Sequence, residues 1–163
     1  EPVLGVKPAD HELRSQLAMD VINRSASFIN HVFVGENRLG QKCWVDTIDI
    51  TRNALMHVIP HGDFAIVILS PDDHRKYFQL IAIDNGGGMD IDGILLRGER
   101  GVYSTSGRYL SELLPFGQRH LKKDYLVSSR NRAVIGRCGD NDPVIVDFDW
   151  SEGTLWIINY WGE

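Results

Sequence analysis

The sequence is poor in the features that mark several large protein classes. It has two cysteines, Cys43 and Cys138, which lie far apart and outside any Cys-x-x-Cys arrangement. This spacing argues against a zinc site or a disulfide framework and favours a reducing, cytoplasmic setting. No run approaches the roughly 18 apolar residues of a membrane-spanning helix, and no basic region followed by an apolar stretch opens the chain. We therefore expect a cytoplasmic protein without a membrane span.

Positive charge is also scarce. The chain has 17 lysines and arginines against 22 aspartates and glutamates, which gives a formal net charge of -5. Nucleic-acid binding depends on clustered Lys and Arg side chains that release counterions from the phosphates. The basic residues here are scattered, except for a short cluster at residues 119–123 that is typical of a solvated helix face. The sequence thus argues against a nucleic-acid partner.

The length and composition fit one globular domain over residues 1–163. The chain is 43% hydrophobic and 24% charged, close to the averages for folded domains. Apolar residues at three- and four-residue steps predict a helix over residues 9–33. Turn residues at 35–40 then precede a second predicted helix over residues 44–59.

The remainder of the chain is dominated by predicted strands. Compact apolar runs at residues 64–69 and 77–83, separated by a polar turn, predict two antiparallel strands. The glycine-rich span 84–106 predicts a loop with at most one short helix near residues 91–96, and a further helix follows at residues 107–114. Later β-rich runs occupy residues 125–127, 133–135, 144–150 and 154–161. This order predicts an α/β fold, a two-layer sandwich whose mixed, mostly antiparallel sheet carries helices packed on one face.

Two segments carry candidate chemistry. On a helical wheel at 100° per residue, Asp46, Asp49, Asn53 and His57 form one polar stripe beside the apolar face of the second helix. Such a stripe faces a cleft or water, and a solvated face is its ordinary explanation.

The second segment is the pattern Asp84-x-Gly86-x-Gly88, directly after an apolar strand. Its glycines permit a tight bend and a close approach by a planar ligand. A carboxylate at the strand end can accept a hydrogen bond from an exocyclic amine such as that of adenine. The alternative is an ordinary Asn-Gly turn, although three consecutive glycines lose much chain entropy on ordering.

Together these segments resemble the GHKL, or Bergerat-fold, ATPases, and in particular the ATP-binding domains of histidine kinases and anti-sigma serine kinases. Residues 49–57 are similar to the Asn-containing motif of that family, and residues 84–89 to its first glycine motif. Glu152-Gly153-Thr154 resembles the Gly-Thr pair that opens the family's last sheet strand. The resemblance implies a Bergerat fold with a nucleotide-binding core over about residues 44–161.

The resemblance implies roles for matching residues. Asn53 would coordinate Mg²⁺ that bridges the phosphates of ATP, an ion suited to hard phosphate oxygens. Asp84 would bind the adenine amino group, and His57 would lie near the phosphates. Gly86 and Gly88 would line the base pocket. The expected nucleotide-binding residues also include Met89, Ser106, Gly107 and Thr154.

The position of Asp49 bears on catalysis. Gyrase-like ATPases and anti-sigma serine kinases have a Glu four residues before the Asn, where a carboxylate can orient water or a hydroxyl for attack on the γ-phosphate. Asp49 is one methylene shorter, and a plain hydrogen bond to backbone or solvent is the alternative. The second glycine motif, which should hold phosphates at a helix N-terminus, retains one glycine, Gly107, within residues 104–110.

The sequence therefore predicts a Mg-ATP-binding domain of histidine-kinase-like type that transfers the γ-phosphate to a protein phosphoacceptor in signalling. Three alternatives stay open. The chain could be a non-catalytic nucleotide-sensing or interaction module with a degenerate lid, a gyrase-like ATP hydrolase, or an unrelated α/β domain with another ligand. Expected partners are ATP and a phosphoacceptor or regulatory protein, and a homodimer remains open.

Overall fold

Two long helices and seven strands make up the described part of the chain. The computed structural model describes residues 2–3, 11–35, 37–56, 65–93, 123–137 and 143–162. In chain order the elements are β1 (Pro2–Val3), α1 (His11–Val32), α2 (Asn37–Met56), β2 (Ala65–Asp72), β3 (Tyr77–Asp84), β4 (Lys123–Ser129), β5 (Arg132–Gly136), β6 (Val144–Asp147) and β7 (Thr154–Trp161). A single helical turn at residues 91–93 follows β3. The helix predicted over residues 107–114 lies outside the described residues.

The helix predicted over residues 9–33 is confirmed as α1, whereas α2 begins earlier than predicted. The turn predicted over residues 35–40 is wrong, because α2 already starts at Asn37. Gly35 has the left-handed backbone of a turn, with φ of +80°. Gly40 is a helical residue whose added Cβ would lie 3.6 Å from Cγ2 of Ile29 in α1. Within the described residues, no helix is long and apolar enough to cross a membrane.

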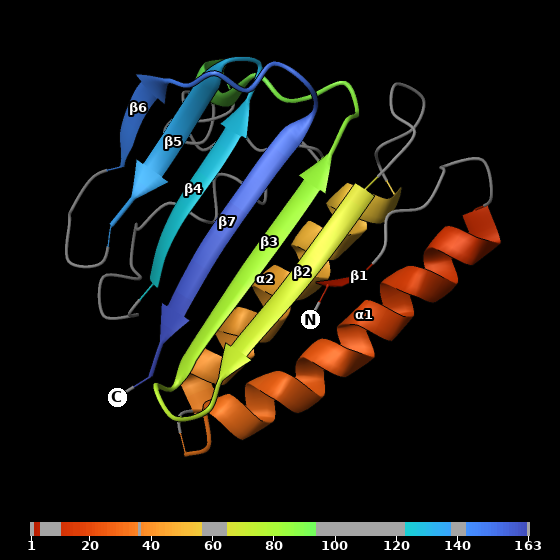
Figure 1. Cartoon of the computed structure of the whole chain (residues 1–163), viewed down its shortest axis with the longest axis vertical. Helices are drawn as coiled ribbons and strands as arrows, with labels where there is room; N and C mark the ends of the chain where they lie inside the picture. The colour runs from red at the N-terminus through yellow and green to blue at the C-terminus, as the bar shows by residue number, and fades with distance from the viewer. Residues whose placement is uncertain are drawn as a thin grey trace.

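The seven strands form one sheet in the order β1-β2-β3-β7-β4-β5-β6 (Figure 1). All six described pairings are antiparallel, so the mixed sheet predicted from the sequence is wrong for this part of the chain. The reason is the position of β7, which lies between β3 and β4 and runs antiparallel to both. The consecutive pairs β2 and β3, β4 and β5, and β5 and β6 are also neighbours in the sheet, as short connections between antiparallel strands allow.

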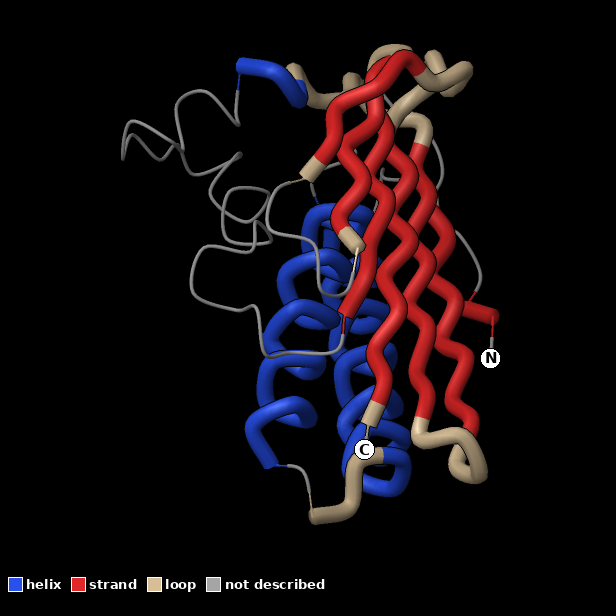
Figure 2. The backbone as a smooth tube through the Cα atoms, turned by 90° about the vertical axis from the view of Figure 1, so that its left-hand side faces the viewer, coloured by secondary structure: helices blue, strands red, loops and turns tan. Residues whose placement is uncertain are grey.

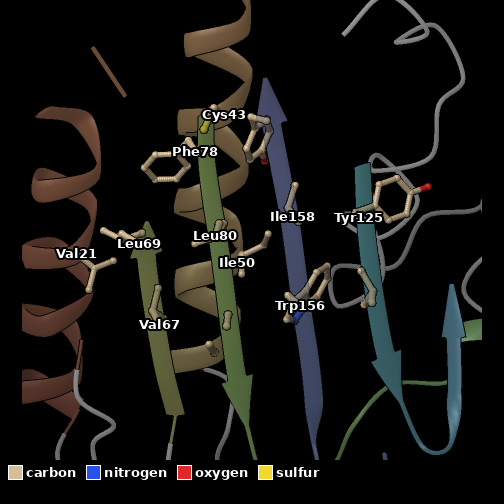
Figure 3. Close-up of a cluster of buried hydrophobic side chains, with 14 of the residues drawn as sticks. Val21, Cys43, Ile50, Val67, Leu69, Phe78, Leu80, Tyr125, Trp156 and Ile158 are labelled. Atoms are coloured by element: carbon tan, nitrogen blue, oxygen red, sulfur yellow. The ribbon is translucent and has the colours of Figure 1, made fainter. Parts of the chain in front are cut away.

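Both helices cover the same face of this sheet (Figure 2), so the two-layer α/β sandwich with helices on one face is confirmed. Strand side chains alternate between faces, and the inward side chains of β3, Phe78, Leu80 and Ala82, are fully buried. They belong to one buried cluster with Ile50 of α2 and side chains of α1 and β7. The labelled core residues of Figure 3 are Val21, Cys43, Ile50, Val67, Leu69, Phe78, Leu80, Tyr125, Trp156 and Ile158.

The direction of α2 across the sheet decides where its polar residues lie. Cys43 lies beside Phe78, near the start of β3, and Ile50 lies beside Leu80, further along that strand (Figure 3). The helix therefore advances toward the end of the sheet where β3 stops at Asp84. Residues in the second half of α2, including Asp49 and Asn53, are carried toward that end.

Candidate functional site

The inward face of β3 ends in a carboxylate instead of an apolar side chain. Asp84 continues the buried positions of the strand and is 8% exposed. Its partner across the ladder is Thr154, the first residue of β7, which is 4% exposed. Two polar side chains are thus buried at the end of the sheet toward which α2 runs.

Backbone groups hold the Asp84 carboxylate in place. The N–H of Gly86 donates to Oδ1 at 2.9 Å, and the backbone N–H of Thr154 also donates to this carboxylate. Burial raises the pKa of Asp84, and the two backbone hydrogen bonds oppose this rise because they favour the charged form. The result is an oriented, partly desolvated hydrogen-bond acceptor.

The glycine loop, residues 85–90, follows directly and has no side chain at three successive positions. Gly88 has φ of +77°, a conformation that glycine adopts without strain. A Cβ at Gly88 would lie 2.7 Å from Oγ of Ser129. The N–H of the next residue, Met89, donates to that same Oγ at 2.8 Å. The backbone of the glycine loop therefore contacts the end of β4 directly, and position 88 has no room for a side chain.

A close backbone approach also explains the glycine before β7. Gly153 has φ of +61°, and an added Cβ would lie 1.9 Å from the carbonyl oxygen of Asp84. No side chain fits at that position without moving the end of β3. Gly153 is thus required by the same strand end that presents the carboxylate.

The polar stripe predicted on α2 is not a continuous solvent-facing stripe. Asp46 is fully buried, which corrects the prediction for this residue. Its Oδ2 accepts a hydrogen bond from the Tyr160 hydroxyl at 2.6 Å and lies 3.5 Å from Nζ of Lys123, while Nζ of Lys42 lies 2.9 Å from Oδ1. Lys123 of β4 and Tyr160 of β7 contact this carboxylate. A helical wheel cannot predict such contacts, because it considers one helix alone.

The structure describes only some of the other residues predicted to bind ATP or Mg²⁺. Asp49 is half-buried in the middle of α2. Asn53 belongs to the last part of α2, and its side chain lies outside the described residues, as do His57, Ser106 and Gly107. Among the described residues, no group of three or more His, Cys, Asp and Glu side chains could hold a metal ion. The Mg²⁺ expected at Asn53 would depend on phosphate oxygens as well, so it stays a prediction.

Sequence reasoning missed two residues that touch the glycine loop, Ser129 and Arg130. Ser129 is fully buried at the end of β4, and Arg130 follows it in the β4–β5 turn. Arg130 and Asn131 have φ of 51° and 62°, as in the type I′ turns that join hairpin strands. Asn131 is a local sequence signal for the turn. No local signal indicates that the turn contacts a loop some forty residues earlier.

Comparison of the sequence with protein-family models and with curated proteins finds no match. The functional argument therefore depends on the residues of the chain and on their arrangement.

Proposed function

We propose that this chain binds Mg-ATP in the manner of the GHKL, or Bergerat-fold, ATPases, with the adenine base at the end of β3. The observation that carries the proposal is Asp84. It is a buried carboxylate that two backbone N–H groups orient beside a loop of three glycines. A turn of this kind needs only a side-chain oxygen that accepts from the N–H two residues later. The Asp84 carboxylate has further acceptor capacity at the end of the strand, which a ligand can use.

The chemistry at Asp84 fits the amine of an adenine base. An ionised carboxylate has about four acceptor positions, and two donors come from the backbone of Gly86 and Thr154. Acceptor capacity remains for an exocyclic amine. Adenine presents such an amine at its six-position, and the choice of adenine among the bases follows from the resemblance to the GHKL ATPases.

The phosphates and the metal are proposed to lie toward α2. This helix contacts β3 and β7 and runs toward the end of the sheet that holds Asp84. Asn53 would then bind Mg²⁺ together with phosphate oxygens. Asp49, one helical turn earlier, would orient water or a hydroxyl for attack on the γ-phosphate. His57, Ser106 and Gly107 remain proposed phosphate neighbours.

The proposed reaction is transfer of the γ-phosphate to a protein partner in cytoplasmic signalling. One observation favours a second candidate, a nucleotide-sensing module without turnover, because residues 104–110 retain one glycine where the family has several. A gyrase-like hydrolase would share the same ATP site and transfer the phosphate to water.

ATP binding tests the shared part of the proposal. Isothermal calorimetry with ATP, with and without Mg²⁺, should give saturable binding to the wild-type protein. Asp84→Asn keeps the size of the side chain and one acceptor oxygen, but its amide nitrogen cannot accept from adenine or from a backbone N–H. Loss of a hydrogen bond to a charged group is worth about 1.5–3 kcal/mol, so ATP affinity should fall roughly 10- to 100-fold.

Asp20→Asn is the matched control, since Asp20 is an exposed carboxylate on α1. It should bind ATP as the wild type does. No binding by the wild type at millimolar ATP would refute the proposed function, and equal affinity in Asp84→Asn would refute the position assigned to the base. Release or transfer of the γ-phosphate by wild type and Asp49→Ala then separates the candidates, because a module without turnover shows neither in the wild type.

A further inference from the structure

The tip of the β4–β5 hairpin, residues 129–132, contacts the glycine loop and the helical turn after it at three points. We propose that Ser129 and Arg130 are positioning residues that hold the glycine loop in the conformation that receives the adenine base. The inference rests on the proposed function and adds to it two residues that would act on the base through the loop backbone.

Ser129 joins three segments through one hydroxyl group. Its Oγ accepts from the N–H of Met89 at 2.8 Å and donates to the carbonyl oxygen of Gly153 at 2.8 Å. The hydroxyl of Thr154 lies 3.3 Å away. A serine hydroxyl has one proton and two lone pairs. Since its proton goes to Gly153, Thr154 is the donor in the third contact, and the hydroxyl is then fully used.

These partners surround Asp84 in the chain and in the sheet. Gly153 lies against the carbonyl oxygen of Asp84, and Thr154 pairs with Asp84 across the ladder. Met89 belongs to the loop that begins after Asp84. Ser129 is therefore a fixed point between the strand that presents the carboxylate and the loop beside it.

The glycine at position 88 fits this contact. An added Cβ would lie 2.7 Å from Oγ of Ser129 and 3.2 Å from Cγ of Arg130. A side chain at position 88 would thus point into the hairpin tip. A glycine is required here both because φ is positive and because the loop packs directly on the hairpin.

Arg130 binds the backbone of the glycine loop one residue earlier, at Gly87. Its Nε and Nη2 both donate to the carbonyl oxygen of Gly87 at 3.2 Å. Arg130 itself has φ of 51°, a conformation that disfavours non-glycine residues. The type I′ turn between β4 and β5 requires this conformation, so the turn itself fixes the backbone of Arg130 next to the loop.

Arg132 anchors the far end of the same region. Its guanidinium forms two hydrogen bonds with Asp92, at 3.0 and 3.1 Å, and a third with Asp147 at 2.8 Å. Asp92 lies in the helical turn that follows the glycine loop. The hairpin tip therefore contacts this region at residues 87, 89 and 92, so the loop is held along its length.

The experiment uses the full chain and compares Ser129→Ala with Ser128→Ala. Ser128 is the matched control because it is also a fully buried serine of β4, but its hydroxyl donates to the carbonyl oxygen of Arg132 within the hairpin. Two quantities are measured for each variant. One is the hydrogen-exchange rate of the Met89 amide in the free protein, and the other is the affinity for adenosine and for Mg-ATP.

We expect Ser129→Ala to accelerate Met89 exchange and to weaken adenosine and Mg-ATP by the same factor, about tenfold, because the phosphate contacts are unchanged. Ser128→Ala should alter neither quantity by more than about twofold. Equal results for the two serine variants would overturn the inference. If the wild type binds no ATP while Met89 exchange still differs between the variants, the proposed function fails and the loop contact stands.

Arg130→Gly provides a second test that does not depend on a destabilised variant. Glycine accepts the positive φ without strain, so the thermal midpoint should not fall. Adenosine should nonetheless bind about threefold more weakly, because the hydrogen bonds with Gly87 are lost. A purely structural role for Arg130 predicts unchanged affinity, and that result would remove Arg130 from the proposal.

Discussion

Replacement of Gly153 by alanine tests the most crowded point of the candidate site. The substitution adds a methyl group to a residue with φ of +61° and directs it to within 1.9 Å of the Asp84 carbonyl oxygen. The left-handed conformation costs a non-glycine residue roughly 1–2 kcal/mol. Forcing extra volume into a packed region costs about 1–3 kcal/mol more. The free energy of unfolding should therefore fall by about 2–5 kcal/mol.

Gly35→Ala separates these two contributions. Gly35 has φ of +80°, but no described atom lies within 4 Å of its added Cβ. This control should lose only the conformational part, roughly 1–2 kcal/mol. Urea denaturation of both variants, followed by far-ultraviolet circular dichroism, gives the two free energies from the midpoints if the slopes are unchanged.

The difference between the two variants measures the close approach of β7 to the end of β3. If Gly153→Ala is no less stable than Gly35→Ala, the backbone contact at Asp84 does not exist as described, and the geometry of the base site is refuted with it. If Gly153→Ala is folded but less stable, ATP affinity should also fall, because the carbonyl that must move belongs to the residue that presents the carboxylate.

Three further predictions concern buried groups. Burial raises the pKa of Asp84 above its ordinary 3.8, so its protonation stabilises the fold below that value and this gain is lost as pH rises through the raised pKa. Asp84→Asn does not titrate, so its stability relative to wild type should be greater at neutral pH than in acid; denaturation curves with the same midpoint difference at both pH values would contradict this. Asp46→Ala leaves the buried amine of Lys123 without its carboxylate, so the free energy of unfolding should fall by about 3–5 kcal/mol, and calorimetric melting will detect it. Burial raises the pKa of the Cys43 thiol well above its usual range, so in a Cys138→Ser background a disulfide reagent should label the protein only after unfolding; rapid labelling of the native protein would show that Cys43 is accessible.

Several elements could be predicted from the sequence because they depend on local patterns. Alternating and compact apolar runs give the strands β2, β3 and β7, since side chains two residues apart share a face of a strand. The long apolar periodicity of residues 11–32 gives α1. The position of Asp84 at the end of an apolar strand, followed by glycines, was equally visible, because it requires only the order of neighbouring residues.

Other features depend on which segments meet. The two glycines at 35 and 40 are equivalent turn signals in the sequence, and only the packing of α2 on α1 distinguishes them. Asp46 is a polar helix residue by its pattern, but Tyr160 and Lys123, from β7 and β4, enclose it. Neither outcome can be obtained from one segment alone.

The sequence by itself determined the strand that ends in Asp84, the side-chain-free loop after it, and a sheet with helices on one face. The tertiary structure decided that β7 lies between β3 and β4, which puts Thr154 beside Asp84 and Ser129 beside Met89. The physical reason is the range of the interactions. Helix and strand periodicities arise among neighbouring residues, whereas strand order and the contacts of a hairpin tip arise from pairings between residues that are far apart in the chain.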